Sequence, residues 1–535
     1  MWSELDGGKK EKYKALITNF ASLSEAFSQK VSSDNMIEII ESVAPIVNSK
    51  FQETAFQRAF GAVGEDIANT SYDASLEIDA THKYLVGIKS FGFHSGDQKI
   101  AQFKASSVTG GWSTILAEAR SNAERLGDKN LADKENAPLY LKVATELANL
   151  RNERIASSKE LVKGFDASDV SVKAIYHVLM PSKKGEDPQI HVGETDYRPI
   201  DIENIEILGS TALLKSTNFK FTDGQHIYKY ADADSQLFMK FHNKEIVVDT
   251  WQVSYLDDAF SFFENLHEET IDVPKRKNVD RTISWMIANE EGNVEESSGF
   301  NGFDGATKLS KSNGYREKRI DSFRKKYENL LSETDMNFII SHLQEILLKK
   351  YPKKEDKREM KRVRSELRDK MISIDNNEMK DAIFSMVYRP VSEMYIPIPE
   401  SRKFHDENPD FFGERIGTFN NGSKKLALNK EGRTFELEFL PSGNRIPSYI
   451  NQDDGKGIQS INKQGILGEW ILRGVFQLKE YEQLTGKRLN DLGINAIRLI
   501  KFKDKSGVIG LEFTWIDVEN PPKDAVGWVS RNRKK

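Results

Sequence analysis

A stretch of charged sequence with helical periodicity divides the chain and sets the main limit on its fold. The segments DSFRKKYENLLSETDMNFIISHLQEILLKKY (321–351) and KKEDKREMKRVRSELRDKMISI (353–374) repeat their apolar residues at helical spacing. A segment rich in glycine, serine and asparagine precedes them. We therefore expect a helical linker domain at 276–385. Its charges are expected to face solvent, and contact with phosphates is the alternative.

Length and composition agree with a divided chain. At 535 residues it is too long for one core, and about three domains are expected. The absence of cysteine excludes disulfides and thiolate metal sites, so any metal is expected to be a hard ion with oxygen ligands. No run of about 18 apolar residues occurs, and the start MWSELDGGKKEKYK is charged. We expect a cytoplasmic protein with no membrane partner.

The sequences before and after the linker differ in their periodicity. Residues 1–275 mix helical and strand periodicity, which predicts an α/β domain with a mixed sheet. Within it, SLEIDATHKYLVGIKSFGF (75–93) alternates on both sides of a polar turn, as a β-hairpin does. Residues 386–535 read as short strands with a few helices, which predicts a compact β-barrel-like domain. The expected fold class is a multidomain protein with α/β and β units.

The hairpin carries the candidate catalytic residues. Asp79 closes its first strand and Lys89 lies on the returning strand, so we expect the two to approach each other. Helical spacing directs Glu53 toward an apolar stripe, where a carboxylate needs a partner. Gln102 and Lys104 follow in KIAQFK and are candidates to complete the site. Asp79 and Glu53 would bind Mg2+ for phosphodiester hydrolysis, and Lys89 would stabilise the developing charge.

This set resembles the PD-(D/E)XK nuclease fold of restriction endonucleases, in which a helix glutamate, a strand aspartate and an acid-x-lysine hairpin hold Mg2+. The resemblance assigns the aspartate to Asp79, the lysine to Lys89 and the helix acid to Glu53. Gly87 departs from the pattern, because an acid is expected two residues before the lysine. We expect Glu53 to replace it.

The C-terminal text resembles the recognition domain of NgoFVII-like type II restriction endonucleases, a DNA-binding pseudobarrel of the EcoRII effector type. The blocks RPVSEMYIPIPES, FFGERIGTF and RTFELEFLPSGNRIPSYINQDDGKGI carry the resemblance. In that family two arms enter the major groove, and they correspond to 401–425 and 442–456 here. Arginine can bond guanine and asparagine or glutamine can bond adenine, whereas lysine and serine reach phosphates. The candidate DNA-binding residues are Arg402, Lys403, Lys424, Lys425, Ser442, Asn444, Arg445, Asn451, Gln452 and Lys456.

The expected function is therefore that of a type II restriction endonuclease, which cuts double-stranded DNA at a specific sequence with Mg2+. One active site per chain implies a homodimer or a transient dimer on DNA. One alternative is a metal-independent nuclease of the phospholipase-D type, because FHNKEIVVDT places His242, Lys244 and Asp249 at the spacing of that motif. The Gly-Ser that should follow the aspartate is missing. Another alternative is a DNA-binding protein without catalytic activity.

Overall fold

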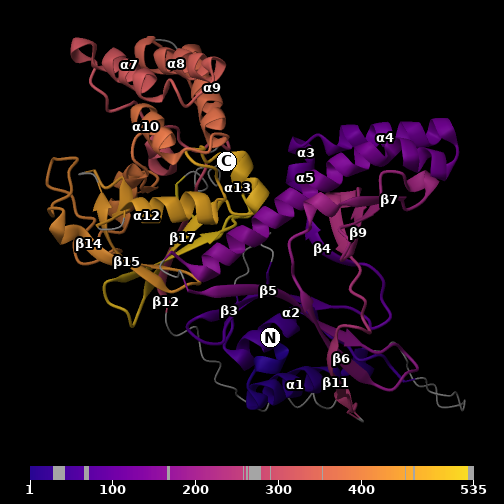
Figure 1. Cartoon of the computed structure of the whole chain (residues 1–535). Coiled ribbons are helices and arrows are strands. Elements are labelled where there is room, and N and C mark those ends of the chain that lie inside the picture. Colours follow the sequence, from indigo (N-terminus) through magenta and orange to yellow (C-terminus); the bar gives the residue numbers. More distant parts are fainter. Residues whose placement is uncertain are drawn as a thin grey trace, which may run out of the picture.

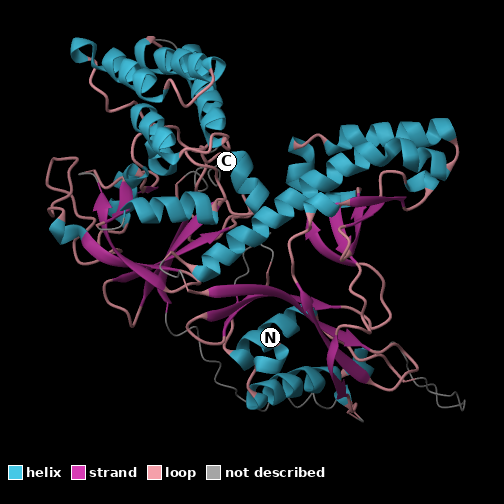
Figure 2. Ribbon diagram, in the orientation of Figure 1, coloured by secondary structure: helices cyan, strands magenta, loops and turns pink. Residues whose placement is uncertain are grey.

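The computed structural model shows a multidomain α/β protein with three β-sheets and helices packed around them (Figure 1, Figure 2). It describes residues 1–27, 42–64, 72–165, 169–256, 258–260, 263, 279–289, 291–351, 354–451, 454–461 and 464–527. None of the helices in these ranges is both long and apolar enough to cross a membrane.

The first sheet is mixed and has six strands in the order β1-β2-β3-β5-β6-β11. Its strands are β1 (Val63–Gly64), β2 (Ala74–Glu77), β3 (His82–Ser90), β5 (Ser171–Pro181), β6 (Gln189–Asp196) and β11 (Val247–Gln252). The first three strands form an antiparallel meander, and β3 then pairs with β5 in parallel. A parallel pair needs a crossover, which here includes the 35-residue helix α5 (Lys129–Lys163).

Alternation along β3 sends its side chains to two different cores. Tyr84, Val86 and Ile88 pack with helices α1 (Gly7–Ala21) and α2 (Ser49–Phe60). Leu85 faces the other way and shares a core with α5. The two sides of this sheet are therefore covered by helices from different parts of the chain.

A second sheet is inserted in the sequence between β3 and β5 and between β6 and β11. It is antiparallel, in the order β4-β10-β9-β8-β7. Its strands are β4 (Gln98–Gln102), β7 (Glu206–Ser210), β8 (Phe219–Thr222), β9 (Ile227–Ala231) and β10 (Gln236–Met239). Helices α4 (Trp112–Leu126) and α5 pack with it around a core rich in aromatic residues, and the short helix α3 (Lys104–Thr109) follows β4 in the sequence. The α/β prediction for this half is thus confirmed at the level of class, although the sequence did not indicate two sheets.

The third sheet has seven strands in the order β12-β17-β18-β14-β15-β16-β13. They are β12 (Val279–Met286), β13 (Ile396–Pro397), β14 (Thr434–Phe439), β15 (Asn444–Asn451), β16 (Gly457–Ser460), β17 (Ala496–Phe502) and β18 (Val508–Thr514). Only β14 and β18 pair in parallel. Since β12 and β13 are its two edges within the described residues, the sheet is open, and the expected barrel-like closure is absent there. Helices α11 (Ser401–Glu407), α12 (Gln464–Glu469) and α13 (Gly486–Leu492) lie between these strands in the sequence.

Helices α7 (Tyr315–Tyr327), α8 (Glu333–Leu348), α9 (Lys354–Ile372) and α10 (Asn377–Val387) account for the charged periodic sequence. Their apolar residues join the same core as the third sheet. The first strand of that sheet, β12, lies inside the predicted linker at 276–385 and pairs with β17. The helices are therefore an insertion between two strands of the C-terminal sheet rather than a connector in front of it.

Helix α5 contacts strands of the first two sheets and the helices of the C-terminal unit (Figure 1). Most of its length packs on the first two sheets, and near its end Leu161 belongs to the core of the C-terminal unit. Phe165, just beyond it, contacts Phe439 and Trp470. The candidate hairpin and the C-terminal sheet are therefore joined by one continuous helix.

Candidate functional site

Asp79 lies in the exposed turn between β2 and β3. Its carboxylate accepts hydrogen bonds from the backbone N–H groups of Thr81 (2.8 Å) and His82 (2.9 Å) and from the Thr81 hydroxyl (2.8 Å). These bonds, led by that from the Thr81 N–H, hold the pKa of the Asp79 carboxyl well below its usual range. Asp79 thus acts as the side chain that closes a tight turn.

The expected approach of Asp79 to Lys89 is wrong. In this antiparallel pair Glu77 lies opposite Lys83, so a residue in the turn can meet only the start of β3. Lys89 is seven residues beyond His82, which corresponds to about 23 Å along an extended strand. Strand pairing therefore separates the two residues that the sequence spacing had joined.

Lys89 instead meets Asp73, the residue before β2. The Lys89 ammonium lies 3.4 Å from Asp73 Oδ2, and the same oxygen accepts a 2.6 Å hydrogen bond from the backbone N–H of Ile88. The Asp73 and Lys89 side chains are 27% and 29% exposed, so solvent and a ligand can reach them. Asp73 Oδ1 has no hydrogen-bond partner among the described residues. The hairpin does combine a carboxylate with a lysine, at its open end.

Packing explains why position 87 has no side chain. A Cβ atom there would lie 3.0 Å from Tyr176 Cδ1 and 3.2 Å from Tyr197 Cε1. The two tyrosine rings are buried and stacked, with their centroids 4.1 Å apart. Burial raises the pKa of the Tyr176 phenol, which keeps it neutral. An acid at position 87 is therefore excluded by two aromatic rings.

Glu53 does not replace that acid, contrary to expectation. It lies on α2, which covers the side of the first sheet to which Ile88 points, whereas Lys89 points to the opposite side. Its carboxylate is 3.0 Å from Lys50 on the same helix. The helical stripe was identified correctly, but it faces the other surface of the sheet.

Gln102 and Lys104 belong to the second sheet and its adjoining helix, away from the Asp73–Lys89 pair. The Gln102 side-chain oxygen accepts a hydrogen bond from Lys99 (2.9 Å). Lys104 is exposed and pairs with Asp234 at 3.4 Å. No hydrogen bond or ion pair joins either residue to Asp73 or Lys89 within the described parts of the chain.

The Asp73–Lys89 pair offers Mg2+ few ligand atoms. Within the described ranges no three histidine, aspartate or glutamate side chains gather closely enough to hold a metal ion. Mg2+ is, however, commonly held by one or two carboxylates together with substrate phosphates. Asp73 Oδ1 is the oxygen that could serve in this way.

The phospholipase-D spacing does not produce a site. His242 and Lys244 lie in an exposed loop after β10, and the His242 backbone is left-handed (φ 54°). Asp249 is on β11, where its Oδ2 accepts a 3.0 Å hydrogen bond from the Trp251 indole. No contact joins the three residues in the part of the chain that the structure describes.

One group of predicted DNA-binding residues gathers around α11. Arg402 donates to the backbone carbonyl of Ser423 (2.8 Å), and Ser401 donates to that of Asp454 (3.2 Å). These bonds hold the turns that contain Ser423 and Asp454 against α11. The candidates here are Arg402, Lys403, Lys424, Lys425 and Lys456, and Asn451 lies at the adjoining end of β15, bonded to Gln459. Gln452 lies outside the described residues.

The second group lies at the other end of β15, about 23 Å away along seven extended residues. Asn444 Oδ1 is buried and faces Gly164, at the end of α5. Ser442 donates to the carbonyl of Phe439 (3.2 Å). Arg445 binds the buried carboxylate of Glu438 at 2.6 Å, which Lys505 also contacts. The predicted second arm is therefore split: Asn451 and Lys456 lie near the first arm, whereas Ser442, Asn444 and Arg445 lie apart from it. Within this second group Asn444 faces the interior, and Arg445 is exposed but paired with Glu438.

A scan against models of protein families finds no match to this chain, and a search of curated proteins finds no similar sequence.

Proposed function

We propose that the protein is a type II restriction endonuclease, which cuts double-stranded DNA at a specific sequence with Mg2+. The observation that carries the proposal is the contact between Asp73 and Lys89 at the open end of the β2–β3 hairpin. It supports the PD-(D/E)XK resemblance, with Asp73 in the place first given to Asp79. The meander followed by a parallel crossover supplies the rigid strands that such a site needs.

The roles of the two side chains follow from their contacts. The Ile88 N–H fixes Asp73 Oδ2, so Oδ1 is the oxygen that would hold Mg2+ together with a DNA phosphate. When bound, Mg2+ would polarise the phosphoryl group and lower the pKa of a water molecule. The Lys89 ammonium would stabilise the negative charge that grows on the phosphate during attack. The Tyr176–Tyr197 stack closes the adjoining part of the site to water.

The C-terminal sheet is the proposed reader of the DNA sequence, as an incompletely closed pseudobarrel. The residues around α11 support this role because Lys424 and Lys425 lie in an exposed turn. Arg402 is held by Asp406 and stacks on Phe419 at 4.0 Å, so its guanidinium is oriented in advance. Cleavage of both strands by a single site per chain requires a dimer on DNA, which is also part of the proposal.

The test compares two aspartates of the same hairpin. Purified protein is incubated with unmethylated phage DNA and Mg2+, and the fragments are separated by electrophoresis. We expect discrete fragments from the unaltered protein and from Asp79→Asn. Asp73→Asn and Lys89→Met should each slow cleavage by about 100-fold or more, because each removes a charge from the reacting centre.

Three other outcomes would contradict the proposal. Undiminished cutting by both Asp73→Asn and Lys89→Met would refute the assigned site. Fragments that persist in excess EDTA and disappear in His242→Ala would indicate the phospholipase-D type. A shift of DNA mobility without fragments would indicate a binding protein that lacks catalysis, a function favoured by the exclusion of an acid at Gly87.

A further inference from the structure

Helix α7 has one face that carries only basic and hydroxyl side chains. At 100° per residue, about 120° of its circumference holds Lys318, Arg319, Lys325 and Lys326, together with Tyr315 and Ser322. The acids Glu317 and Asp321 fall outside this sector. The buried residues Ile320, Phe323 and Tyr327 form a separate stripe that packs into the core. The basic face is therefore directed away from the protein.

Three cations of this face have no partner among the described residues. The side chains of Lys318, Arg319 and Lys325 make no hydrogen bond or ion pair with any residue that the structure describes, and each is exposed. We call these three residues the α7 stripe. Lys326 differs, since its ammonium lies 2.7 Å from Glu378.

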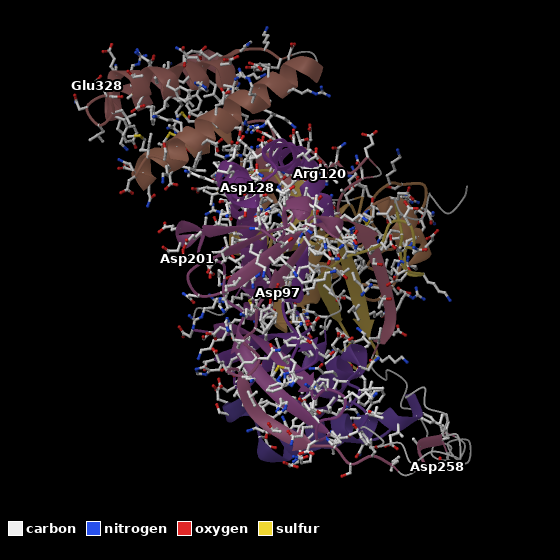
Figure 3. All side chains as sticks on the ribbon, turned by 90° about the vertical axis from the view of Figure 1, so that its right-hand side faces the viewer. Asp97, Arg120, Asp128, Asp201, Asp258 and Glu328 are labelled. Atoms are coloured by element: carbon white, nitrogen blue, oxygen red, sulfur yellow. The ribbon has the colours of Figure 1, made fainter. Side chains whose placement is uncertain are left out.

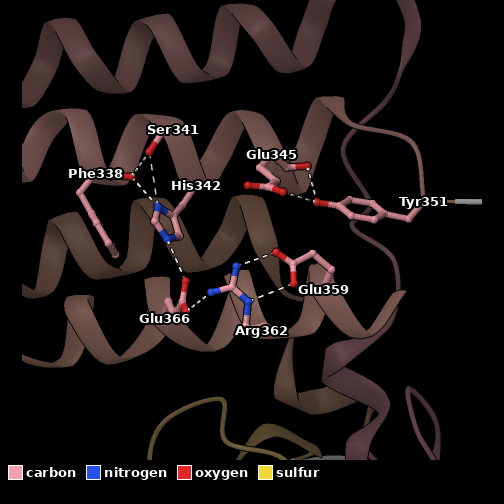
Figure 4. Close-up of polar contacts among 8 residues, drawn as sticks. All are labelled: Phe338, Ser341, His342, Glu345, Tyr351, Glu359, Arg362 and Glu366. Carbon is pink, nitrogen blue, oxygen red and sulfur yellow. Dashed lines mark hydrogen bonds and ion pairs between the residues drawn. The ribbon is translucent and has the colours of Figure 1, made fainter. Parts of the chain in front are cut away.

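The neighbouring helices neutralise their charges, which makes α7 distinct. Figure 4 shows Arg362 of α9 between Glu359 and Glu366, and His342 of α8 beside Glu366. Other basic residues of α9 also have carboxylate partners: Lys361 with Glu296, Arg364 with Asp304, Arg368 with Asp369 and Lys370 with Asp335. Many basic side chains of α9 are therefore neutralised by carboxylates, whereas those of the α7 stripe are not.

The position and net charge of α7 suit an anionic partner. Six basic and two acidic residues give the helix a charge of +4 in a chain whose net charge is −5. The helices α7–α9 project from the C-terminal sheet, and Glu328, which follows α7, lies at the outer end of this projection (Figure 1, Figure 3). Lys318 and Lys325 are about 10.5 Å apart along the axis, close to three base-pair steps of duplex DNA.

We infer that the α7 stripe binds the phosphate backbone of DNA beside the sequence that the C-terminal sheet reads. The identity of this partner rests on the proposed function. Such contacts carry no base preference, and they add affinity that falls steeply with salt. The stripe would thus hold the duplex without selecting its sequence.

The experiment measures the affinity of the full-length protein for a duplex in Ca2+ at several salt concentrations. Each lost phosphate contact lowers the slope of log affinity against log salt by about 0.9. We expect the triple variant K318Q/R319Q/K325Q to lose about 2 to 3 units of slope. The matched control K326Q/K349Q/K370Q removes the same charge from cations that already have carboxylate partners, and its slope should be unchanged.

An unchanged slope in the stripe variant, with normal binding by the unaltered protein, would overturn this inference and leave the proposed function intact. Failure of the unaltered protein to bind DNA at any salt would overturn both. Vesicles containing phosphatidylserine provide the remaining arm of the test. Binding to them that depends on the stripe, while the DNA slope stays constant, would assign the surface to a membrane and overturn the inference.

Discussion

The Arg154 guanidinium of α5 donates a hydrogen bond to the backbone carbonyl of Asp491 in α13. A second bond from the same side chain, 3.0 Å long, reaches the carbonyl of Gln102, and the guanidinium lies 4.5 Å from the Phe103 ring centre. Burial lowers the pKa of Arg154 to about 10, so it remains charged at neutral pH. One buried cation therefore joins the second sheet to the C-terminal unit.

We expect Arg154→Met to destabilise the protein by about 2 to 3 kcal/mol, because it removes the donor from the buried Asp491 carbonyl and from the partly buried Gln102 carbonyl. Urea unfolding followed by tryptophan fluorescence would measure the loss. Arg120→Met is the control, since Arg120 is exposed and its nearest carboxylate is 4.0 Å away. Equal stability of the two variants would contradict the structural role of Arg154.

Gly87→Ala is expected to cost about 1 to 3 kcal/mol of stability, because the new methyl group must displace Tyr176 or Tyr197. The same substitution at Gly96 meets no atom within 4 Å and should be neutral. Thermal or urea unfolding of both variants provides the comparison. A stable Gly87→Ala protein would mean that the tyrosine stack does not fill the space beside Lys89.

His177 should make stability depend on pH. Its ring is buried among Trp2, Tyr13 and Phe56, and this burial lowers its pKa to about 3. The unfolded chain takes up a proton near pH 6.5, so stability falls as the pH drops below that value. Between pH 7.5 and pH 5.0 the loss due to this group is about 2 kcal/mol.

We expect His177→Phe to remove that part of the loss, as shown by urea unfolding at the two pH values. The control is His94→Gln, which changes an exposed ring and should retain the full dependence. A His177→Phe protein that loses as much stability between pH 7.5 and pH 5.0 as the unaltered protein would contradict this prediction. It would mean that His177 accepts a proton in the folded state.

The two groups of predicted DNA contacts should respond differently to substitution. Lys424→Gln with Lys425→Gln should lower DNA affinity and reduce the salt slope by about 2 units, because both lysines lie on the exposed turn beside α11. Asn444→Ala should leave affinity and sequence preference unchanged, since its oxygen faces Gly164 inside the protein. Fluorescence anisotropy with specific and random duplexes measures both. A changed sequence preference in Asn444→Ala would instead indicate that Asn444 contacts DNA.

Local patterns predicted several elements well. The alternation in 75–93 corresponds to β2 and β3, the stripe at Phe56 and Phe60 corresponds to α2, and the periodic charged text corresponds to α7–α9. These elements are visible because each depends on contacts between residues near in sequence. The mixed α/β class of the first half follows from the same patterns.

The expected contact between Asp79 and Lys89 is wrong because such a contact depends on strand pairing. The number of residues between Asp79 and Lys89 suggests a contact between them. In a hairpin, however, the residue before the first strand lies near the end of the second strand. Pairing the residues of the two strands outward from the turn places Asp73, and not Asp79, near Lys89. The exclusion of a side chain at Gly87 depends on Tyr176 and Tyr197, which are distant in sequence, and no local pattern could reveal it.

Helix α5 has a consequence for any attempt to exchange parts between proteins. Leu161 and Phe165 complete the interior of the C-terminal unit, although they precede its first strand by more than one hundred residues. A fragment beginning near residue 276 would lack both side chains and expose the apolar surface that they cover. A transplantable C-terminal unit from this protein would therefore have to carry the end of α5 with it, and a junction chosen from the linear order of domains would cut through a shared interior.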